Sequence, residues 1–372
     1  MSKVLLISGT GIISGAEYVI ADYLKITKLK NDFLILTSNT NNIFEFFNNC
    51  LPKKVYSTHF LSPVGAHSSR FFLILKLIYF IFSFFSFFKI IKKHKSLRVF
   101  YGNNTGDIIY SFFANVFKKK FILNVHDIIA DNSFFVKLIK FFDKYVNVYI
   151  AGSNAVKISL IKNGVLEEKI HIVYTGLEPK EFYKKNFVKN SLVLGFVGLL
   201  DNRKNPLEFV SFIKELYKKN INVYGKIVYK ETYESALILK KIRIEISEFN
   251  LPIELVGSIA RNELDVFYKS LDFLMITSKN DPLPTVVLES MNNSIPVIGK
   301  SVDGIPEMIC DSENGYLYNT IDDFTKLYLE LKNLDQKKYL FLQKNALETI
   351  EKKFSNKNKI KYMNKILFDS KI

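Results

Sequence analysis

The chain has few cysteines. Only Cys50 and Cys310 occur among its 372 residues, and neither has other metal-ligating residues around it at the spacing of a zinc site. The sequence therefore predicts neither a disulfide framework nor a structural zinc, and a reducing cytoplasm is the expected compartment. The apolar stretch after Met1 is too short for a signal peptide, so we expect no secretory leader.

Acidic residues are scarce in the first half of the chain. Residues 1–190 contain 26 Lys and Arg against 12 Asp and Glu, a net charge of +14, whereas residues 191–372 contain 26 against 24, a net charge of +2. An anionic membrane surface, nucleic acid, or the composition of an AT-rich genome would each account for basic residues. Genome composition would affect both halves, and no nucleic-acid-binding module is recognisable. We therefore expect an anionic membrane surface as a partner, and no nucleic acid.

Short β-branched runs alternate with longer helical patterns, which indicates α/β domains with parallel sheets. A chain of 372 residues fits two domains of about 180 residues each. The first series of expected strands is Val4–Ser8, Phe33–Thr37, Arg98–Tyr101, Phe121–Val125, Val148–Ala151 and His171–Tyr174. The second series is Leu192–Val197, Asn222–Val228, Ile253–Val256, Phe273–Ile276 and Pro296–Ile298. Residues 175–191, between the series, are the expected linker, and helical pattern dominates from Ile321 onward.

A Phe-rich segment runs from Phe71 to Phe88. As a helix it would span about 27 Å, slightly less than a bilayer core of about 30 Å. Lys76 interrupts it, and it lies where a crossover helix must join two parallel strands. We expect a helix packed on the sheet, although a helix lying in the membrane interface stays open. The lysines that favour the membrane interface follow directly: Lys89, Lys92, Lys93 and Lys95.

Two carboxylates, Asp281 and Glu289, are separated by seven residues. Asp281 follows an apolar run, in an expected loop, and Glu289 lies in the opening turns of a helix expected to start near Thr285. A helix N-terminus suits a phosphate because its N–H groups are unpaired and its dipole end is positive. A carboxylate on that helix can accept hydrogen bonds from sugar hydroxyls. The pattern predicts a nucleotide-sugar pocket; a surface loop capping an ordinary helix is the alternative.

This segment, with its two prolines and the downstream Gly304-Ile-Pro-Glu307, resembles the Glu-x7-Glu region of family 4 (group 1) retaining glycosyltransferases. Asp281 stands at the first acidic position. The resemblance covers nearly the whole chain and implies the GT-B fold, in which two Rossmann-like domains with parallel sheets face a cleft. It implies an acceptor-side domain over residues 1–178 and a nucleotide-sugar-binding domain over residues 190–353. A C-terminal helix in residues 354–372 would pack back on the first domain.

Gly198 opens a segment that ends in Arg203 and Lys204, after the strand expected at residues 192–197. Adjacent cations can neutralise a diphosphate leaving group, whose charge grows in the transition state. Arg203 offers a bidentate fork and Lys204 a point charge; a solvated loop is the alternative. The segment resembles the family's Gly-Arg-Leu-x-x-x-Lys turn, with Leu199 where many members have Arg.

The first half contains two weaker signals. A Gly-rich turn from Ser8 through Gly15 to Glu17 lacks the spacing of a dinucleotide fingerprint. It is similar to the Gly-Gly-x-Glu turn of the family, with Ser14 in place of the first Gly. His126 follows an expected strand, at the sheet edge where ligands usually bind. A lone His is more often structural, whereas the family resemblance implies a His that faces the transferred sugar, with Asp127 as a polar contact or orienter.

The resemblance implies a role for each of these residues. Glu289 would bind the ribose hydroxyls, Asp281 the sugar hydroxyls, and the turn at Ile259 would lie beside the nucleobase. The expected donor-binding residues are Gly15, Gly198, Arg203, Lys204, Ile259, Leu283, Pro284, Thr285 and Glu289. The expected catalytic residues are His126, Asp281, Arg203 and Lys204.

The expected function is that of a metal-independent, retaining, hexosyltransferase-type glycosyltransferase, since no Asp-x-Asp motif has suitable surroundings. It would use no cofactor and a UDP- or GDP-sugar as donor. A saccharide acceptor, lipid-linked, fits the basic and Phe-rich first domain, as in bacterial surface polysaccharide or lipopolysaccharide synthesis at the inner face of the cytoplasmic membrane. The alternatives are a nucleotide-sugar epimerase or phosphorylase of the same fold and a catalytically silent scaffold of a polysaccharide complex; a nucleic-acid binder is the remotest.

Overall fold

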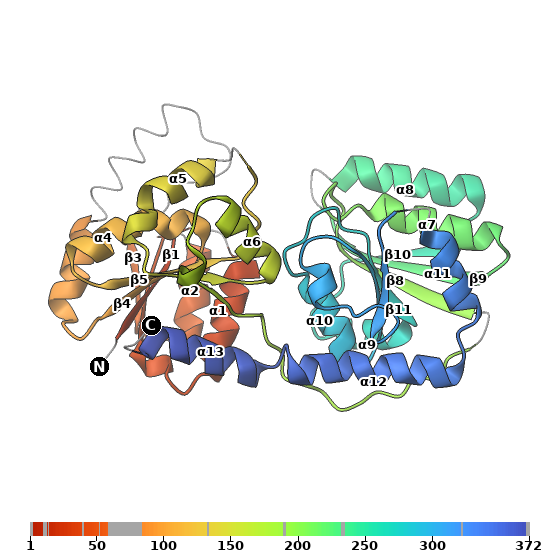
Figure 1. Cartoon of the computed structure of the whole chain (residues 1–372). Coiled ribbons are helices and arrows are strands. Elements are labelled where there is room, and N and C mark those ends of the chain that lie inside the picture. The colour runs from red at the N-terminus through yellow and green to blue at the C-terminus, as the bar shows by residue number, and fades with distance from the viewer. Residues whose placement is uncertain are drawn as a thin grey trace. The chain divides into compact units, whose positions relative to one another are not determined.

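A computed structural model describes residues 3–9, 13, 15–38, 41–51, 53–58, 84–131, 134–188, 191–231, 235–320 and 323–369 (Figure 1). The chain forms two compact units. The first unit consists of residues 1–175 together with residues 356–372, and the second unit consists of residues 176–355. Each unit has its own parallel sheet and its own core.

The first unit has a seven-stranded sheet in the order β3-β2-β1-β4-β5-β6-β7, and its strand pairs are parallel. The strands are β1 Val4–Ser8, β2 Phe33–Ser38, β3 Val55–Thr58, β4 Val99–Gly102, β5 Lys120–Val125, β6 Val148–Ala151 and β7 Ile170–Ile172. Residues of β1, β2 and β4 are buried throughout because helices cover both faces of the sheet. The six strands expected from the sequence are all present, and β3 is additional.

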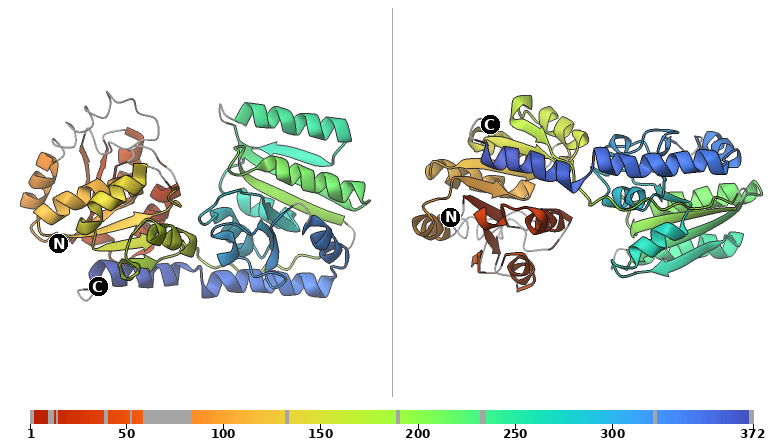
Figure 2. Two further views of the ribbon diagram at one scale, coloured as in Figure 1. Left: turned by 45° about the horizontal axis from the view of Figure 1, so that its top comes forward. Right: turned by 90° about the horizontal axis from the view of Figure 1, so that it is seen from below.

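Two layers of helices cover this sheet (Figure 2). One core cluster joins the sheet to the helix at residues 84–93 and to α4 Ser111–Val116, α5 Phe134–Phe142 and α6 Asn154–Lys162. The other joins it to α1 Gly15–Ile26, α2 Asn41–Cys50 and α13 Asn356–Phe368. Short 3-10 turns complete the unit: η1 Lys30–Asp32, η2 Thr105–Tyr110, η3 Asp143–Tyr145 and η4 Glu167–Lys169.

The C-terminal helix α13 belongs to the first unit, although the helix before it, α12 Gln336–Lys352, belongs to the second. The hydroxyl of Tyr23 donates to Asn364 Oδ1 at 2.7 Å, and the buried Lys359 Nζ donates to the carbonyl of Val19 at 2.7 Å. Burial lowers the pKa of Lys359 to about 8. Polar and apolar contacts together therefore hold α13 against α1.

The second unit has a six-stranded parallel sheet in the order β10-β9-β8-β11-β12-β13. Its strands are β8 Ser191–Leu199, β9 Asn222–Lys230, β10 Ile253–Gly257, β11 Phe273–Ile276, β12 Val297–Lys300 and β13 Gly315–Tyr318. Its helices are α7 Pro206–Lys218, α8 Ser235–Phe249, α9 Leu264–Ser270, α10 Thr285–Asn292, the 3-10 turn η5 Ile305–Glu307, α11 Phe324–Lys332 and α12. The order is that of a Rossmann sheet, and the prediction of two Rossmann-like domains is confirmed.

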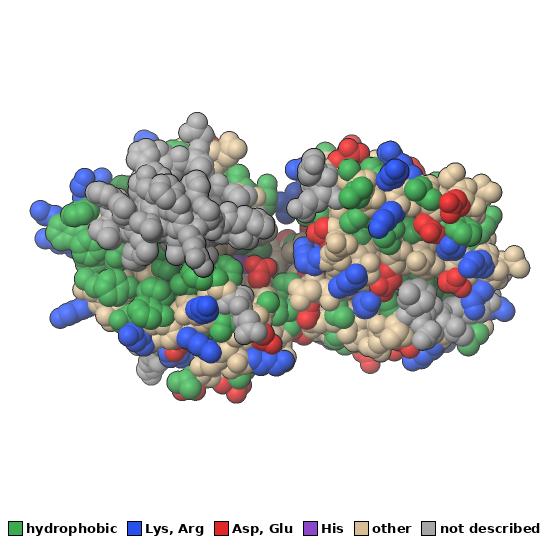
Figure 3. All heavy atoms as spheres, turned by 90° about the horizontal axis from the view of Figure 1, so that it is seen from above, with side chains coloured by type: hydrophobic (Ala, Val, Ile, Leu, Met, Phe, Trp, Pro, Cys, Tyr) green, Lys and Arg blue, Asp and Glu red, His purple; other side chains and the backbone are tan. Residues whose placement is uncertain are grey.

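The first unit carries hydrophobic side chains on its surface. In the view from above they gather on this unit with lysines around them, whereas charges of both signs are mixed over the second unit (Figure 3). The predicted Phe-rich helix lies largely outside the described residues: residues 84–88 are helical, and residues 71–83 are not described. None of the helices in the described part of the chain combines the length and apolar character needed to cross a membrane.

Candidate active site

The second sheet brings two predicted site segments together at its carboxyl edge. The chain runs from β8 to β9 and β10 on one side and then returns to β11 on the other side of β8. Loops that leave adjacent strands in opposite directions open a crevice at this switch point, and ligands of such sheets usually bind there. Arg203 and Lys204 follow β8, and Asp281 follows β11, so the fold places all three at the switch point.

The carboxylate of Asp281 is the centre of this cluster. Lys204 Nζ lies 2.5 Å from Asp281 Oδ2, and Arg203 Nη1 lies 3.8 Å from the same oxygen. The hydroxyl of Ser278 donates to it at 3.3 Å. The side chains of Asp281 and Lys204 are 5% and 16% exposed, whereas Arg203 is 45% exposed. Lys204 is therefore a largely buried, hydrogen-bonded partner of Asp281, whereas the Arg203 side chain is more exposed to solvent.

A second loop fixes the backbone at Asp281. The backbone N–H of Asp281 donates to Asp303 Oδ2 at 2.8 Å, and the N–H of Gly304 donates to the carbonyl of Asp281 at 3.1 Å. Burial raises the pKa of Asp303, and the charge of Asp281 raises it further, while the hydrogen bond from Asp281 opposes both. A Cβ at Gly304 would lie 1.8 Å from the carbonyl oxygen of Pro282, so only glycine fits there. The Asp303-Gly304 pair is thus the support of the Asp281 loop.

Glu289 lies on α10, the helix that begins four residues after Asp281. Its Oε2 accepts a hydrogen bond from the hydroxyl of the buried Tyr268 at 2.8 Å. Burial raises the pKa of Glu289, and the Tyr268 hydrogen bond opposes the rise. Within the fully described stretch 251–320, no side chain caps the N-terminus of α10, where Pro284 is the N-cap residue. The N–H of Val287 already donates to the carbonyl of Pro284 at 3.1 Å, so the N–H groups of Thr285 and Val286 are the ones that can bind an anion.

The other predicted donor-binding positions are more dispersed. Leu283 is half-buried and Thr285 is exposed, at the start of α10. Gly198 is inside β8 rather than in a turn. A Cβ added at Gly198 would lie 3.6 Å from Lys204 Cγ. Ile259 is half-buried and follows β10, two residues after Gly257, whose φ of 78° turns the chain away from the strand.

His126 and Gly15 belong to the first unit. The side-chain amide nitrogen of Asn124 lies 3.0 Å from His126 Nε2, within hydrogen-bond distance. Burial lowers the pKa of His126 and outweighs the opposite effect of Asp127. His126 lines a cavity of about 20 Å³, the size of one water molecule, together with Tyr101 and Lys359. Gly15 is the first residue of α1, and a Cβ there would meet no atom of the described residues within 4 Å.

The first unit also has a polar cluster, at the switch point between β1 and β4. Glu17 Oε1 accepts from Ser8 Oγ at 3.0 Å and from Asn104 Nδ2 at 2.9 Å. Asp107 accepts from three backbone N–H groups, those of Gly9, Asn103 and Asn104. Both carboxylates are buried. Glu17 ends the Gly-rich turn noted in the sequence, whereas the only sequence signal for Asp107 is its position after an expected strand, which many structural residues share.

We expect Asp107 to make the stability of the first unit depend on pH. Burial raises its pKa to about 8 from an ordinary 3.8, so between these values the folded state holds a proton that the unfolded state releases. The free energy of unfolding therefore falls as pH rises through this range, by at most about 1.4 kcal/mol per pH unit. Urea titrations of the wild type and Asp107→Asn across the range test this: the difference between them should change with pH, and parallel curves would contradict the assignment.

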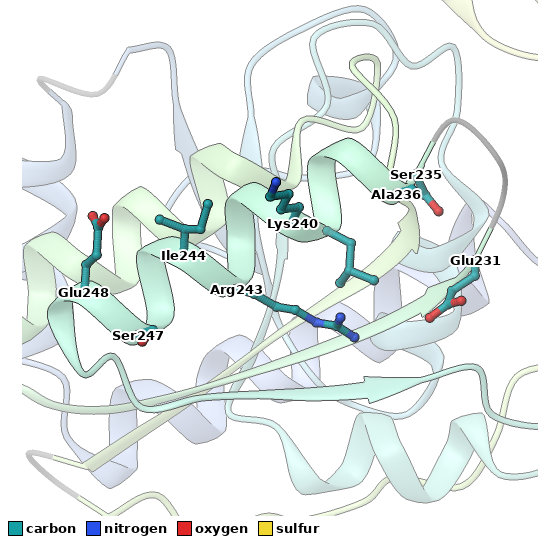
Figure 4. A pocket seen from close by; sticks show the side chains of 9 residues that line it. Glu231, Ser235, Ala236, Lys240, Arg243, Ile244, Ser247 and Glu248 are labelled. Atoms are coloured by element: carbon teal, nitrogen blue, oxygen red, sulfur yellow. The ribbon is translucent and has the colours of Figure 1, made fainter.

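A separate groove of about 870 Å³ runs along α8 (Figure 4). Its lining residues are Glu231, Ser235, Ala236, Leu239, Lys240, Arg243, Ile244, Ser247 and Glu248. Both signs of charge occur along it, and it includes neither Asp281 nor the N-terminus of α10. The predicted site residues therefore do not line this groove.

The fold and the site define a class: a two-domain protein of the GT-B fold with a polar cluster at the switch point of its second sheet. The crystal structure of HepE from Anabaena in complex with UDP and glucose matches this chain with a TM-score of 0.76, over 99% of each chain and at 16% identity. At this identity the likeness concerns the fold, and it confirms the predicted GT-B fold. Residues 178–349, which lie in the second unit, match the family of glycosyl transferases group 1. Together these findings support a group 1 glycosyltransferase.

Two curated relatives agree with this class. An uncharacterised glycosyltransferase of Methanocaldococcus jannaschii is 28% identical over 223 residues, 58% of this chain and 59% of that protein. The GalNAc-α-(1→4)-GalNAc-α-(1→3)-diNAcBac-PP-undecaprenol α-1,4-N-acetyl-D-galactosaminyltransferase of Campylobacter jejuni is 26% identical over 162 residues, 42% of this chain and 43% of that protein. The chain thus spans about half the length of these relatives.

Proposed function

We propose that the protein is a retaining glycosyltransferase that moves a sugar from a nucleotide-diphosphate donor to a saccharide acceptor. The observation that carries the proposal is the cluster of Lys204 and Arg203 around Asp281 at the switch point of the second sheet. It lies beside a helix N-terminus that no side chain of the described stretch 251–320 caps. Cations and free N–H groups in one place suit a diphosphate.

The donor would be a UDP- or GDP-sugar held by the second unit. Glu289 is already oriented by Tyr268, so its remaining carboxylate oxygen can accept hydrogen bonds from the ribose hydroxyls. The N–H groups at Thr285 and after it would hold the phosphate, and Ile259 would lie beside the base. The HepE crystal structure contains UDP and glucose, which supports a nucleotide-sugar donor for this fold.

The chemical step would depend on charge neutralisation. When the glycosidic bond of the donor breaks, negative charge grows on the diphosphate, and cations placed there in advance stabilise the transition state. We assign this to Lys204 and Arg203 without a metal ion. Asp281 holds Lys204 in place before the donor binds, and it would contact the sugar hydroxyls. His126, whose pKa is lowered by burial, would act as a hydrogen-bonding partner of the transferred sugar.

The acceptor would be a lipid-linked saccharide received by the first unit, in bacterial surface polysaccharide synthesis of the O-antigen or capsule type. The name of the Campylobacter relative includes an undecaprenyl-diphosphate-linked acceptor, which supports this class. The excess of Lys and Arg in residues 1–190, 26 against 12 acidic residues, fits work at the inner face of an anionic membrane.

The donor site can be tested by nucleotide binding. The wild type would be tested with the diphosphates of uridine, guanosine, adenosine and cytidine. We expect either UDP or GDP to raise its melting temperature. Glu289→Ala should abolish this shift, because the ribose hydroxyls lose their acceptor. Glu248→Ala, an exposed glutamate on α8, is the control and should keep the full shift. If no nucleotide stabilises the wild type, the donor site is not formed as proposed and the scaffold alternative gains support.

A further inference from the structure

Exposed aromatic side chains are concentrated in one part of the first unit. Of the eight exposed phenylalanines among the described residues, five lie between residues 84 and 145. They are Phe85, Phe88, Phe112, Phe134 and Phe141, with exposed fractions of 57%, 50%, 40%, 48% and 62%. Single exposed apolar residues are ordinary, but a concentration of large ones marks an interaction surface.

These phenylalanines lie on helices that pack side by side. The helix at residues 84–93 contacts α4 and the turn after it, because Phe84 lies 5.4 Å from both Phe113 and Phe117, ring centre to ring centre. The turn η3, which follows α5, contacts α4, because Phe112 lies 5.8 Å from Tyr145. The buried faces of all these helices contribute to the same core cluster on one side of the sheet. Their exposed faces therefore form the outer surface of a single layer, here called the aromatic face.

The segment that carries the aromatic face is also strongly basic. Residues 84–145 contain eleven Lys and Arg and four Asp. Of these aspartates, Asp107 is buried and Asp143 pairs with Lys169 at 3.0 Å. Exposed lysines and phenylalanines share the outer side of α5, where Phe134, Lys137, Lys140 and Phe141 are all exposed. An amphipathic helix normally presents polar residues alone to water, so phenylalanine and lysine together there require another explanation.

We infer that the aromatic face docks on an anionic lipid bilayer. Phenylalanine rings enter the boundary between headgroups and acyl chains, while lysines around them bind lipid phosphates. A second protein surface would bury the phenylalanines equally well. It would also have to offset the exposed lysines on these helices, which include Lys89, Lys92, Lys137 and Lys140, whereas an anionic membrane supplies negative charge by itself.

The inference rests on the proposed function only for its purpose, namely that a lipid-linked acceptor is reached at the membrane. Docking itself requires no nucleotide, sugar or acceptor. A failure of docking and a failure of glycosyl transfer are therefore separate results. None of the residues of the aromatic face belongs to the candidate active site, so changes there should leave consumption of a water-soluble donor unaltered.

Flotation with lipid vesicles tests the inference. The full chain should float with vesicles of phosphatidylcholine and phosphatidylglycerol and not with phosphatidylcholine alone, and high salt should weaken binding. The variant Phe85→Ser/Phe112→Ser/Phe141→Ser should bind at least about tenfold more weakly. The variant Lys89→Gln/Lys92→Gln/Lys140→Gln should lose about fivefold per lysine.

Each variant has a matched control on the second unit. Leu237→Ser/Val266→Ser/Leu329→Ser removes three exposed apolar residues, and Lys240→Gln/Lys241→Gln/Arg243→Gln removes three exposed charges. Both controls should bind vesicles like the wild type. The inference is overturned if the wild type binds neither kind of vesicle or if the phenylalanine variant binds undiminished. It is also overturned if light scattering shows a dimer that this variant dissociates, because a second copy would then cover the face.

Discussion

Lys204→Ala is expected to lower kcat/KM for the nucleotide-sugar donor by about 10²–10³. The lysine ammonium lies 2.5 Å from Asp281, at the point where we place the leaving diphosphate. Loss of one preorganised charge that stabilises a transition state typically has an effect of this size. Lys204→Arg should recover only part of the rate, because the guanidinium does not reproduce the point charge of the ammonium.

Loss of stability has to be separated from loss of catalysis, because Lys204→Ala also leaves Asp281 buried without its closest cation. Lys300→Ala is a close control: Lys300 lies 3.0 Å from Glu208, with side-chain exposures of 19% and 8% that resemble those of the Lys204–Asp281 pair. Each variant breaks one largely buried ion pair, at a cost of about 3–5 kcal/mol. Only Lys204→Ala should lower the rate of folded enzyme. Equal rates for the two folded variants would remove Lys204 from the mechanism.

Gly304→Ala is expected to have the second largest effect and to act on the Asp281 loop. An added Cβ would lie 1.8 Å from the Pro282 carbonyl oxygen, so the backbone of one loop must move. The hydrogen bonds that Asp281 makes with Asp303 and Gly304 would be displaced with it. We expect destabilisation of about 3 kcal/mol or more and loss of nucleotide binding even in the folded fraction.

Gly198→Ala provides the comparison for this glycine. It lies in β8 of the same unit, and an added Cβ would meet its nearest atoms at 3.5 Å, an ordinary contact. Its free energy of unfolding should change by less than about 1 kcal/mol. Urea unfolding and nucleotide titration of both variants test the prediction. If Gly304→Ala binds nucleotide as tightly as the wild type, the Asp303-Gly304 pair does not support the site.

Most of the strands could be located along the chain from the sequence, whereas two strands could not. Continuous apolar runs such as Val4–Ser8 and Phe273–Ile276 predict buried parallel strands, and both are present with these bounds. The strands β3 and β13 were not expected. β3 is a half-exposed edge strand with the polar residues Ser57 and Thr58, and β13 is only four residues long, so neither has a clear apolar run.

The candidate site shows a different limit. Asp281, Lys204 and Glu289 could be selected from motifs, but the contact between Lys204 and Asp281 joins positions 77 residues apart. Only the return of the chain to β11 beside β8 brings them together. Tyr268 was not expected at all, because a tyrosine in a short helix gives no signal that its hydroxyl will orient Glu289. Sequence motifs identified the candidate site residues, and the topology of the sheet determined which of them contact each other.

The most direct test of the central claim is to incubate the full chain with a panel of UDP- and GDP-sugars and lipid extract as acceptor source. Free nucleoside diphosphate and the anomeric configuration of the product would be measured together. We predict that one donor is consumed, that the product keeps the donor's anomeric configuration, and that Lys204→Ala abolishes both signals while Lys300→Ala does not. Interconversion of the donor into another sugar nucleotide would indicate an epimerase instead. Tight nucleotide binding without consumption of any donor would contradict transfer altogether.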